Sequence, residues 1–286
     1  MTIAEAIQKA AGRLAAHKVP DARRDAELLL CHALGKDRAW LLIHMQDQLD
    51  DQGRRVYERD IDRRSVREPL QYITGIQEFW GLPFKVTPAV LIPRPETELV
   101  VESAIKAAER SAAPVIIDLC TGSGCIAISL AKELPRARIF ATDRSEDALE
   151  IARQNARQNS VAERVRFLEG DLFGPLEEMD LRMGVDIIVT NPPYIRSEEL
   201  PTLQPEVRDF EPEMALIAGV TGTEIAERII SAAHNYLRSG GSLIMEMGMG
   251  QTDAIRKIIA DTNRYRKPEV LKDLAGIERV IVVHKK

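Results

Sequence analysis

The residues best suited to chemistry follow an apolar run in the second half of the chain. VDIIVT (185–190) reads as a buried strand, and Asn191, Pro192, Pro193 and Tyr194 come directly after it. Two consecutive prolines cannot extend a strand, because they donate no backbone N–H and have a fixed φ. The strand therefore ends here and presents a side-chain amide, rigid carbonyls and a phenol. Asn191 Oδ1 and the Pro192 carbonyl can accept two N–H groups of a planar nitrogen, while Tyr194 packs on its flat face.

A glycine-containing turn after an earlier strand predicts a site for a nucleotide-like cofactor. DLCTGSGC (118–125) connects the strand VIIDL (115–119) to a helix. Gly122 and Gly124 allow the backbone to turn tightly and approach a ligand, and the helix N-terminus offers unpaired N–H groups. Ala127 stands where a dinucleotide fingerprint has its third glycine, and no Walker lysine follows, so a P-loop is excluded. A glycine-rich turn without a ligand is the alternative interpretation.

Two carboxylates follow the next two expected strands. Asp143 comes about 20 residues after the glycines, where an acid can accept both hydroxyls of an adenosine ribose. Its alternative role is to cap the helix that begins at Ser145. Asp171 can accept a hydrogen bond from the exocyclic amine of adenine, with Leu172 or Phe173 packed on the ring. Because the carboxyl ends of parallel strands meet at one crevice, we expect these groups to lie close together.

Taken together, these strand ends predict methyl transfer from S-adenosylmethionine to a planar nitrogen. Such a nitrogen is a poor nucleophile, and alignment by fixed groups can contribute up to ~7–11 kcal/mol. No general base is required, because the proton can leave after the methyl group has been accepted. Cys120 and Cys125 have no histidine nearby in sequence, so we expect packing residues and not nucleophiles there. The cysteines and histidines form no metal-ligand spacing, so no metal is expected.

The pattern of residues divides the chain into three parts. Residues 1–75 read as helices only, residues 76–96 as a β-hairpin linker, and residues 97–286 alternate strands with helices. We expect the alternating part to form a doubly wound, mainly parallel α/β sheet with an antiparallel edge made by its last two strands. Its seven expected strands cover residues 115–119, 138–142, 165–169, 185–190, 242–246, 269–271 and 280–283.

Charge and composition exclude several classes of protein. The 286 residues are 45% hydrophobic and 29% charged, which is typical of a soluble globular chain. No segment approaches the ~18 apolar residues of a membrane span, and the N-terminus has no secretory signal pattern. The cysteines form no even framework, so a cytoplasmic location is expected. The net charge of −5 argues against a general nucleic-acid-binding surface.

An arginine-rich run lies in the helical part, between Arg54 and Arg67. It is interleaved with acids, and we interpret it as a solvated helix face. The alternative is a docking face for an acidic or RNA-bearing partner.

Six segments spread along the chain resemble one known family. They are REPLQYITG (67–75), EFWGLPF (78–84), LIPRPETE (91–98), TGSGCIA (121–127), TNPPY (190–194) and FEPEMAL (210–216). With them the chain resembles, over nearly its whole length, the bacterial protein-(glutamine-N5) methyltransferases that modify peptide chain release factors. NPPY is shared with adenine-N6 methyltransferases, whereas IPRPETE and FEP…AL are more specific to the protein-glutamine group.

The resemblance implies a class I S-adenosylmethionine methyltransferase with a Rossmann-like fold and a small N-terminal all-helical domain. The reaction that it implies yields S-adenosyl-L-homocysteine, uses no metal, and methylates the glutamine of the Gly-Gly-Gln motif in class I release factors. The helical domain helps to grip this partner, and a monomer without membrane or direct nucleic-acid contacts is expected. Asn191, Pro192 and Tyr194 are the implied catalytic residues, and with Pro193 they hold the substrate glutamine. The implied cofactor-binding residues are Thr121, Gly122, Ser123, Gly124, Cys125, Asp143, Asp171, Leu172 and Asn191.

One residue departs from the family pattern. Cys120 stands where the family often has glycine, and DLCTGSGC is similar to sister enzymes that methylate a glutamine of a large-subunit ribosomal protein. These sister enzymes are the first alternative. The others are an adenine-N6 nucleic-acid methyltransferase and a non-catalytic translation module that keeps the fold.

Two charged segments have open roles. Around IPRPETE, the polar residues either cover the cofactor or line a glutamine tunnel, and Thr97 can instead cap the following helix; the polar residues are Arg94, Glu96, Thr97 and Glu98. The acids flanking FEP are expected on a surface loop, where they either meet the partner or are only solvated; they are Asp209, Glu211 and Glu213.

Overall fold

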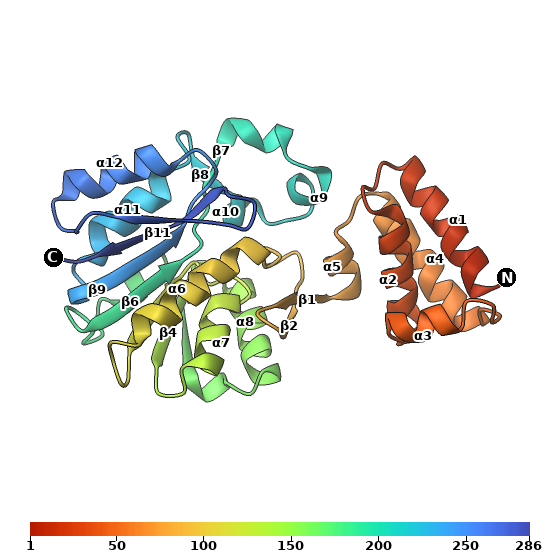
Figure 1. The fold of residues 1–286 in the computed structure, drawn as a ribbon, viewed down its shortest axis with the longest axis horizontal. Coiled ribbons are helices and arrows are strands. Elements are labelled where there is room, and N and C mark those ends of the chain that lie inside the picture. Colours follow the sequence, from red (N-terminus) through yellow and green to blue (C-terminus); the bar gives the residue numbers. More distant parts are fainter. The chain divides into compact units, whose positions relative to one another are not determined.

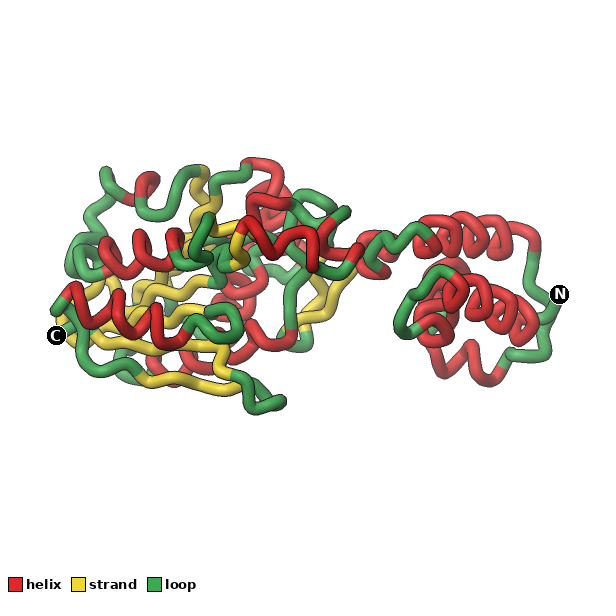
Figure 2. Tube along the Cα trace, turned by 90° about the horizontal axis from the view of Figure 1, so that it is seen from above, coloured by secondary structure: helices red, strands yellow, loops and turns green.

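The computed structural model describes residues 1–286, which divide into two compact units (Figure 1). The helical unit comprises Met1–Ile76 together with Gln204–Phe210. The sheet unit comprises Gln77–Leu203 together with Glu211–Lys286. Figure 2 shows that the strands are confined to the sheet unit. The inclusion of residues 204–210 in the helical unit was not expected, because this segment follows the Asn-Pro-Pro-Tyr turn in the sequence.

The helical unit is built from amphipathic helices around its own core. Thr2 and Glu5 form the capping box expected at the start of α1, and Gly35 ends α2 in a left-handed conformation, with φ of 62°. The buried apolar residues recur on one face of each helix and include Ile3, Ile7, Leu14, Leu29, Leu30, Leu41, Tyr57 and Ile61. The helices are α1 (Ile3–Ala16), α2 (Ala22–Leu34), α3 (Arg38–Ile43), α4 (Asp51–Ser65), α5 (Leu70–Thr74) and α9 (Pro205–Arg208).

A buried ion-pair cluster within the helical unit corrects one expectation. Arg64 on α4 is only 5% exposed, so the interpretation of the arginine run as a solvated face is wrong for this residue. Its Nε donates to Asp25 Oδ2 at 2.8 Å, and its Nη2 donates to Glu206 Oε1 at 3.0 Å. Arg67 Nε donates to the same Glu206 oxygen at 2.6 Å. The side chain of Arg54 at the start of the run is 43% exposed, in keeping with that interpretation.

The sheet unit contains the expected doubly wound sheet of seven strands. The strand order is β10-β11-β9-β6-β3-β4-β5, with β9 to β5 parallel and β11 antiparallel to both of its neighbours. The order reverses at β3, which lies between β4 and β6, and ligands bind at such a switch point in open sheets of this kind. The strands are β3 (Val115–Leu119), β4 (Arg138–Asp143), β5 (Val165–Glu169), β6 (Val185–Thr190), β9 (Leu237–Glu246), β10 (Glu269–Lys272) and β11 (Glu278–His284).

Alternate residues of each strand face opposite layers of helices. Ile116, Ile187 and Ile244 pack with α6 (Glu98–Ala108), α7 (Cys125–Glu133) and α8 (Glu146–Gln158). Ile117 and Ile188 pack with α11 (Glu224–Ala233) and α12 (Thr252–Thr262) on the other face. Both faces of the parallel sheet are therefore buried, and successive strand residues are apolar whichever face they point to. This explains the continuous apolar runs that identified the strands.

Two smaller sheets complete this unit. The expected hairpin is present as β1 (Ile76–Phe79) and β2 (Leu82–Lys85), and buried Asn155 holds it by accepting from Lys85 N at 2.7 Å. After the Asn-Pro-Pro-Tyr turn, β7 (Ile195–Arg196) pairs with β8 (Ile217–Gly219), and α10 (Glu213–Leu216) precedes β8. These short elements were not predicted. No helix has the length and apolar character needed to cross a membrane.

Candidate active site

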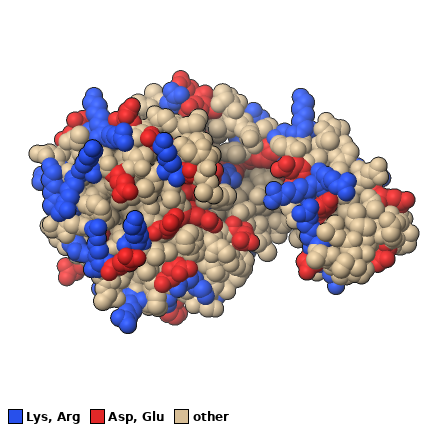
Figure 3. Space-filling model, in the orientation of Figure 1, with Lys and Arg blue, Asp and Glu red and all other residues tan.

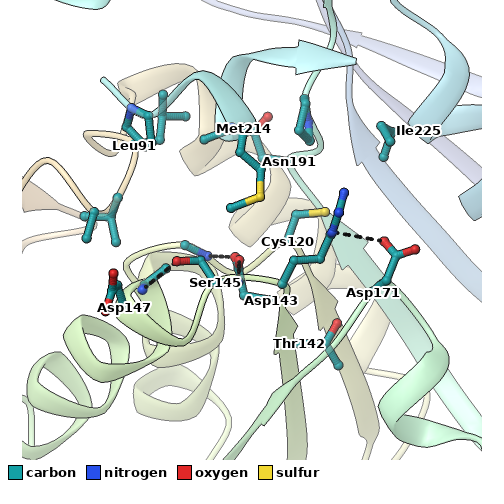
Figure 4. A pocket seen from close by; sticks show the side chains of 18 of the residues that line it. Leu91, Cys120, Thr142, Asp143, Ser145, Asp147, Asp171, Asn191, Met214 and Ile225 are labelled. Carbon is teal, nitrogen blue, oxygen red and sulfur yellow. Dashed lines mark hydrogen bonds and ion pairs between the residues drawn. The ribbon is translucent and has the colours of Figure 1, made fainter. Parts of the chain in front are cut away.

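A cavity of about 350 Å³ lies at the carboxyl ends of β3, β4, β5 and β6 (Figure 4). This volume is within the range of small-molecule sites. Figure 4 shows Leu91 and Met214 on one side of it and Asp143, Ser145 and Asp171 on the other. The predicted site residues that line the cavity are Gly122, Asp143, Asp171, Leu172, Asn191 and Pro193. The remaining predicted residues lie outside its lining; they are Thr121, Ser123, Gly124, Cys125, Pro192 and Tyr194.

The two glycines of the turn have different tasks. Gly124 has φ of 80° at the start of α7, and a Cβ there would lie 2.9 Å from Ile128 Cδ1, so this glycine allows close helix packing. Gly122 has φ of 54°, and a Cβ there would meet no atom within 4 Å. It therefore leaves room for a ligand at the cavity wall. Cys120 also has a left-handed conformation, with φ of 58°, which explains why glycine suits this position.

Buried side chains hold the rest of the glycine-containing turn by hydrogen bonds. Buried Asp118 accepts from Thr121 Oγ1 at 2.6 Å and from Ala127 N at 3.2 Å. Asn155 Nδ2 donates to the Ser123 carbonyl at 2.9 Å, so one buried amide joins the turn to the hairpin. Sequence reasoning missed Asn155, whose signal was only an amide on the apolar face of α8. The hydroxyl of Thr121 is thus engaged in a hydrogen bond within the protein.

Asp143 holds the turn from the cavity side. Its Oδ2 accepts from Gly122 N at 2.8 Å, and its Oδ1 accepts from Ser145 N at 3.0 Å. Ser145 Oγ accepts from Ala148 N at 3.1 Å and is the cap of α8, so the capping role does not belong to Asp143. Burial raises the pKa of Asp143, although the two backbone donors act against this rise.

Asp171 lies at the cavity, but arginines surround its carboxylate. It forms ion pairs with Arg228 and, at 3.9 Å, with Arg144 Nε. Its side chain is 43% exposed. The neighbouring Leu172 is buried, and its carbonyl accepts from Thr142 Oγ1 at 2.9 Å. An adenine amine would therefore share the carboxylate with two guanidinium groups.

Asn191 is linked to two buried residues: Thr97, whose role the sequence analysis left open, and Glu246, which it did not assign to the site. Asn191 Nδ2 lies 3.1 Å from Thr97 Oγ1, which donates to Glu246 Oε2 at 2.6 Å. Thr97 makes no side-chain bond to the N-terminus of α6, so its expected alternative as a helix cap is wrong. Glu246 was read only as the end of a strand. An acid that ends an apolar run is the same signal that identified Asp143.

The turn after β6 is rigid. The Tyr194 carbonyl accepts from Gln251 Nε2 at 2.8 Å, while Gln251 Oε1 accepts from Gly248 N at 2.9 Å. Burial, together with the nearby Glu246, raises the pKa of Tyr194 to about 12, so its phenol is neutral at physiological pH. Burial also raises the pKa of Cys125 to about 12 and of Cys120 further, which keeps both thiols protonated and suits packing residues.

The segment IPRPETE and the segment around FEP, whose roles the sequence left open, contact each other. Arg94 Nη2 donates to Glu211 Oε1, and the Glu211 side chain is 1% exposed. The expectation that Glu211 is a surface-loop residue is therefore wrong, because its carboxylate is buried against the segment before α6. Burial raises the pKa of Glu211, and Arg94 acts against this. Glu98 Oε1 accepts from Trp80 N at 2.8 Å, so it holds the hairpin.

The fold and its cavity define an S-adenosylmethionine-dependent methyltransferase, and residues 97–204 match the family described as "Methyltransferase small domain". Residues 5–75 match the "PrmC N-terminal domain". The chain belongs to the release factor glutamine methyltransferase family. It is 42% identical to the release factor glutamine methyltransferase of Moorella thermoacetica over 100% of this chain and 99% of that protein. The enzyme of the same name from Geobacter sulfurreducens is 41% identical over 98% of this chain and 95% of its own length.

Solved structures share the fold at low sequence identity. The hMettl16 catalytic domain in complex with the MAT2A 3′UTR hairpin 6 superposes with a TM-score of 0.58 and 18% identity, over 77% of this chain and 81% of that one. The ribosomal protein L11 methylase from Lactobacillus delbrueckii subsp. bulgaricus gives a TM-score of 0.50 and 20% identity, over 70% of this chain and 84% of that one. At this identity the likeness is one of fold alone.

Proposed function

We propose that the protein transfers a methyl group from S-adenosylmethionine to the side-chain N5 of the glutamine in the Gly-Gly-Gln motif of class I peptide chain release factors. The observation that carries this proposal is the placement of Asn191 and Pro193 at the cavity, directly after β6. Relatives at about 40% identity over the whole chain bear the name of that activity. Methylation of this glutamine would modulate translation termination.

The cavity fits the cofactor by shape and by chemistry. Leu91, Met214 and Ile225 give it an apolar wall, while Asp143 supplies a carboxylate for the ribose hydroxyls. The carboxylate oxygens of Asp143 keep further lone pairs beside their backbone donors. S-adenosylmethionine, when bound, supplies an electrophilic methyl group on a sulfonium. The backbone around Gly122 completes the proposed cofactor site, Asp171 and Leu172 line another part of it, and Asn191 borders it on the side where the glutamine is proposed to bind.

The chain's own residues orient the nucleophile. Asn191 Oδ1 and the Pro192 carbonyl accept the two N–H groups of the glutamine amide, so that its nitrogen lone pair points away from the protein acceptors. Tyr194, neutral and held through Gln251, covers the flat face of the amide and excludes water. The nitrogen loses one proton after its new bond to carbon has formed, and no side chain has to remove it beforehand. Alignment by these fixed groups is the main source of acceleration.

We assign partner binding to the helical part, residues 1–75, a linking role to residues 76–96, and the chemistry to residues 97–286. Every residue that lines the cavity belongs to the last two ranges, which leaves the helical part free for recognition. On the face drawn in Figure 3, acidic and basic side chains are interspersed over the sheet unit. We expect a cytoplasmic monomer that contacts protein and not nucleic acid, because duplex binding relies on clustered Lys and Arg.

The test locates the added methyl group. Purified enzyme and S-adenosylmethionine are incubated with an intact class I release factor, with a short Gly-Gly-Gln peptide, or with a release factor whose motif reads Gly-Gly-Ala. Tandem mass spectrometry should place 14 mass units (about one CH₂ equivalent) on the motif glutamine only, with higher kcat/KM on the intact protein because the helical part contributes binding. An unmodified motif glutamine in the intact release factor, or equal methylation of the Gly-Gly-Ala protein, would refute the proposal.

Removal of the Asp143 carboxylate should weaken cofactor binding. Asp143→Ala eliminates the acceptor for the ribose and frees the Gly122 N–H, and hydrogen bonds to a charged group contribute about 1.5–3 kcal/mol. We expect the Kd for S-adenosylhomocysteine, measured by calorimetry, to rise about 10- to 100-fold. Asp253→Ala is the control, since the Asp253 side chain is 99% exposed. An unchanged Kd in Asp143→Ala would exclude this role.

A further inference from the structure

Three polar side chains from three separate elements form a hydrogen-bonded chain behind the cavity. Asn191 follows β6, Thr97 precedes α6, and Glu246 ends β9. The parallel register pairs Thr190 with Met245, which brings Asn191 and Glu246 together at the sheet edge. Thr97 and Glu246 are each only 2% exposed, whereas Asn191 borders the cavity. This series of hydrogen-bonded side chains thus begins with a buried carboxylate and ends with an amide at the cavity.

While Glu246 is ionised, the number of protons on these three side chains fixes the direction of both hydrogen bonds. A carboxylate only accepts, and the Thr97 hydroxyl has one proton, which it donates to Glu246. The hydroxyl oxygen can then only accept from Asn191, so the atom that faces it is the Nδ2 donor. Asn191 Oδ1 consequently points to the other side of the planar amide. An acceptor oxygen is what the glutamine N–H requires.

We propose that Thr97 and Glu246 are positioning residues, which hold the Asn191 amide in the one orientation that offers its oxygen to the substrate amide. This inference rests on the proposed function. It gives the IPRPETE segment a task in the reaction, and it assigns a use to a buried acid that does not line the cavity.

The protonation state of Glu246 determines whether the Asn191 amide keeps this orientation. Burial raises the pKa of Glu246 to about 7. The charged groups that act on it are Arg279 on β11, Glu96 and Arg94, and Glu246 in turn raises the pKa of Tyr194 and of Cys125. A protonated Glu246 can donate to Thr97 Oγ1, which then turns its own proton toward Asn191. The amide would be drawn to present Oδ1 to Thr97, and its NH₂ would face the substrate N–H groups. Turnover should therefore fall as the pH drops through about 7.

The principal test removes only the hydroxyl. Thr97→Val keeps the volume and the branch of the side chain, and Thr97→Ser restores the hydroxyl. With an intact release factor, we expect kcat to fall about 10- to 100-fold in Thr97→Val and to stay within about threefold of wild type in Thr97→Ser. The Kd for S-adenosylhomocysteine should be unchanged in both. Thr252→Val is the matched control, because buried Thr252 donates to Glu278 Oε2 at 2.6 Å in the same kind of bond.

A purely structural role predicts a different pattern. Thr97→Val and Thr252→Val would then lose similar stability, and their kcat values would both stay near wild type. Wild-type kcat in folded Thr97→Val overturns the inference. If wild-type enzyme itself does not methylate the release factor, the proposed function is what fails, so the two failures are distinct.

A second variant keeps the inference testable if Thr97→Val does not fold. Glu246→Gln is nearly isosteric and does not titrate. The ratio of wild-type kcat to Glu246→Gln kcat should fall about tenfold between pH 8 and pH 6, as expected for the loss of one ionised group with a pKa of about 7. Taking the ratio removes the contributions of other titrating groups. A ratio that is constant over this pH range overturns the inference.

Discussion

Asn191→Ala should lose about 10²- to 10³-fold in kcat while its affinity for the cofactor stays within about threefold of wild type. Alanine removes one of the two acceptors for the glutamine N–H groups and leaves the cavity wall otherwise intact. The Pro192 carbonyl remains, but a single acceptor does not fix the rotation of an amide about its bond. Because acceleration depends on alignment, the loss should appear in kcat more than in binding.

The measurement is methyl transfer from labelled S-adenosylmethionine to a saturating release factor, with calorimetry of S-adenosylhomocysteine alongside. Asn235→Ala is the matched control, since Asn235 is exposed and its hydrogen bonds are made by its backbone, whose N–H donates to the Ala232 carbonyl and whose carbonyl accepts from Met183 N. Wild-type kcat in Asn191→Ala would show that the amide does not orient the substrate. A large rise in Kd with unchanged kcat would assign Asn191 to the cofactor instead.

The part of the site that could be predicted depends on local signals. Asp143, Asp171 and Asn191 each follow an apolar run, and the alternation of strands with helices places such strand ends at one edge of the sheet. Left-handed backbone is equally local, which is why Gly122 and Gly124 were found. These signals need no knowledge of which strand neighbours which, and the predicted fold class is confirmed.

The supporting residues could not be predicted because their partners are far apart in sequence. Thr97 and Glu246 are 149 positions apart, and Asn155 joins Lys85 to Ser123 over intervals of 70 and 32 positions. Such pairs follow from strand order and helix packing, which the local pattern does not specify. The same reason explains Glu211, because the arginine that pairs with its buried carboxylate, Arg94, lies 117 positions away.

The arginine run shows the limit of charge patterning in the helical unit. Arg54 and Arg64 look alike in sequence, yet the side chain of one is 43% exposed and that of the other is 6% exposed. The difference comes from Asp25 and Glu206, which accept from Arg64 and are 39 and 142 positions away from it. A local pattern identifies a charged helix face but not the distant segment that covers part of it.

Arg64→Met should destabilise the helical unit by about 3–5 kcal/mol. Removing one partner of a buried ion pair has this effect because the remaining charge is left uncompensated. Here two carboxylates are affected, since Arg64 donates to both Asp25 and Glu206. Methionine retains the apolar stem of the side chain, so the loss reports on the charge. Arg67 still holds Glu206, which should keep the segment 204–210 in place at neutral pH.

The effect should also depend on pH with a definite sign. Burial raises the pKa of Glu206, but hydrogen bonds from Arg67 and Arg64 outweigh it, and the net pKa lies below the ordinary 4.5. A lowered pKa means that the unfolded chain binds more protons, so this stabilisation is present above pH 4.5 and is lost as the pH falls through the lowered value. In Arg64→Met, the acid-induced loss of stability between about pH 5 and pH 3 should be smaller than in wild type.

Native-state hydrogen exchange of α2 and α4 amides is the suitable measurement, because two units in one chain do not unfold as one two-state system. Arg54→Met is the matched control, since Arg54 pairs only with exposed Asp51 and Glu58 and exposed pairs contribute about 0–1 kcal/mol. Protection in these helices should drop far more in Arg64→Met than in Arg54→Met. Equal protection in the two variants would mean that the buried cluster holds the segment 204–210 without stabilising the helices around it.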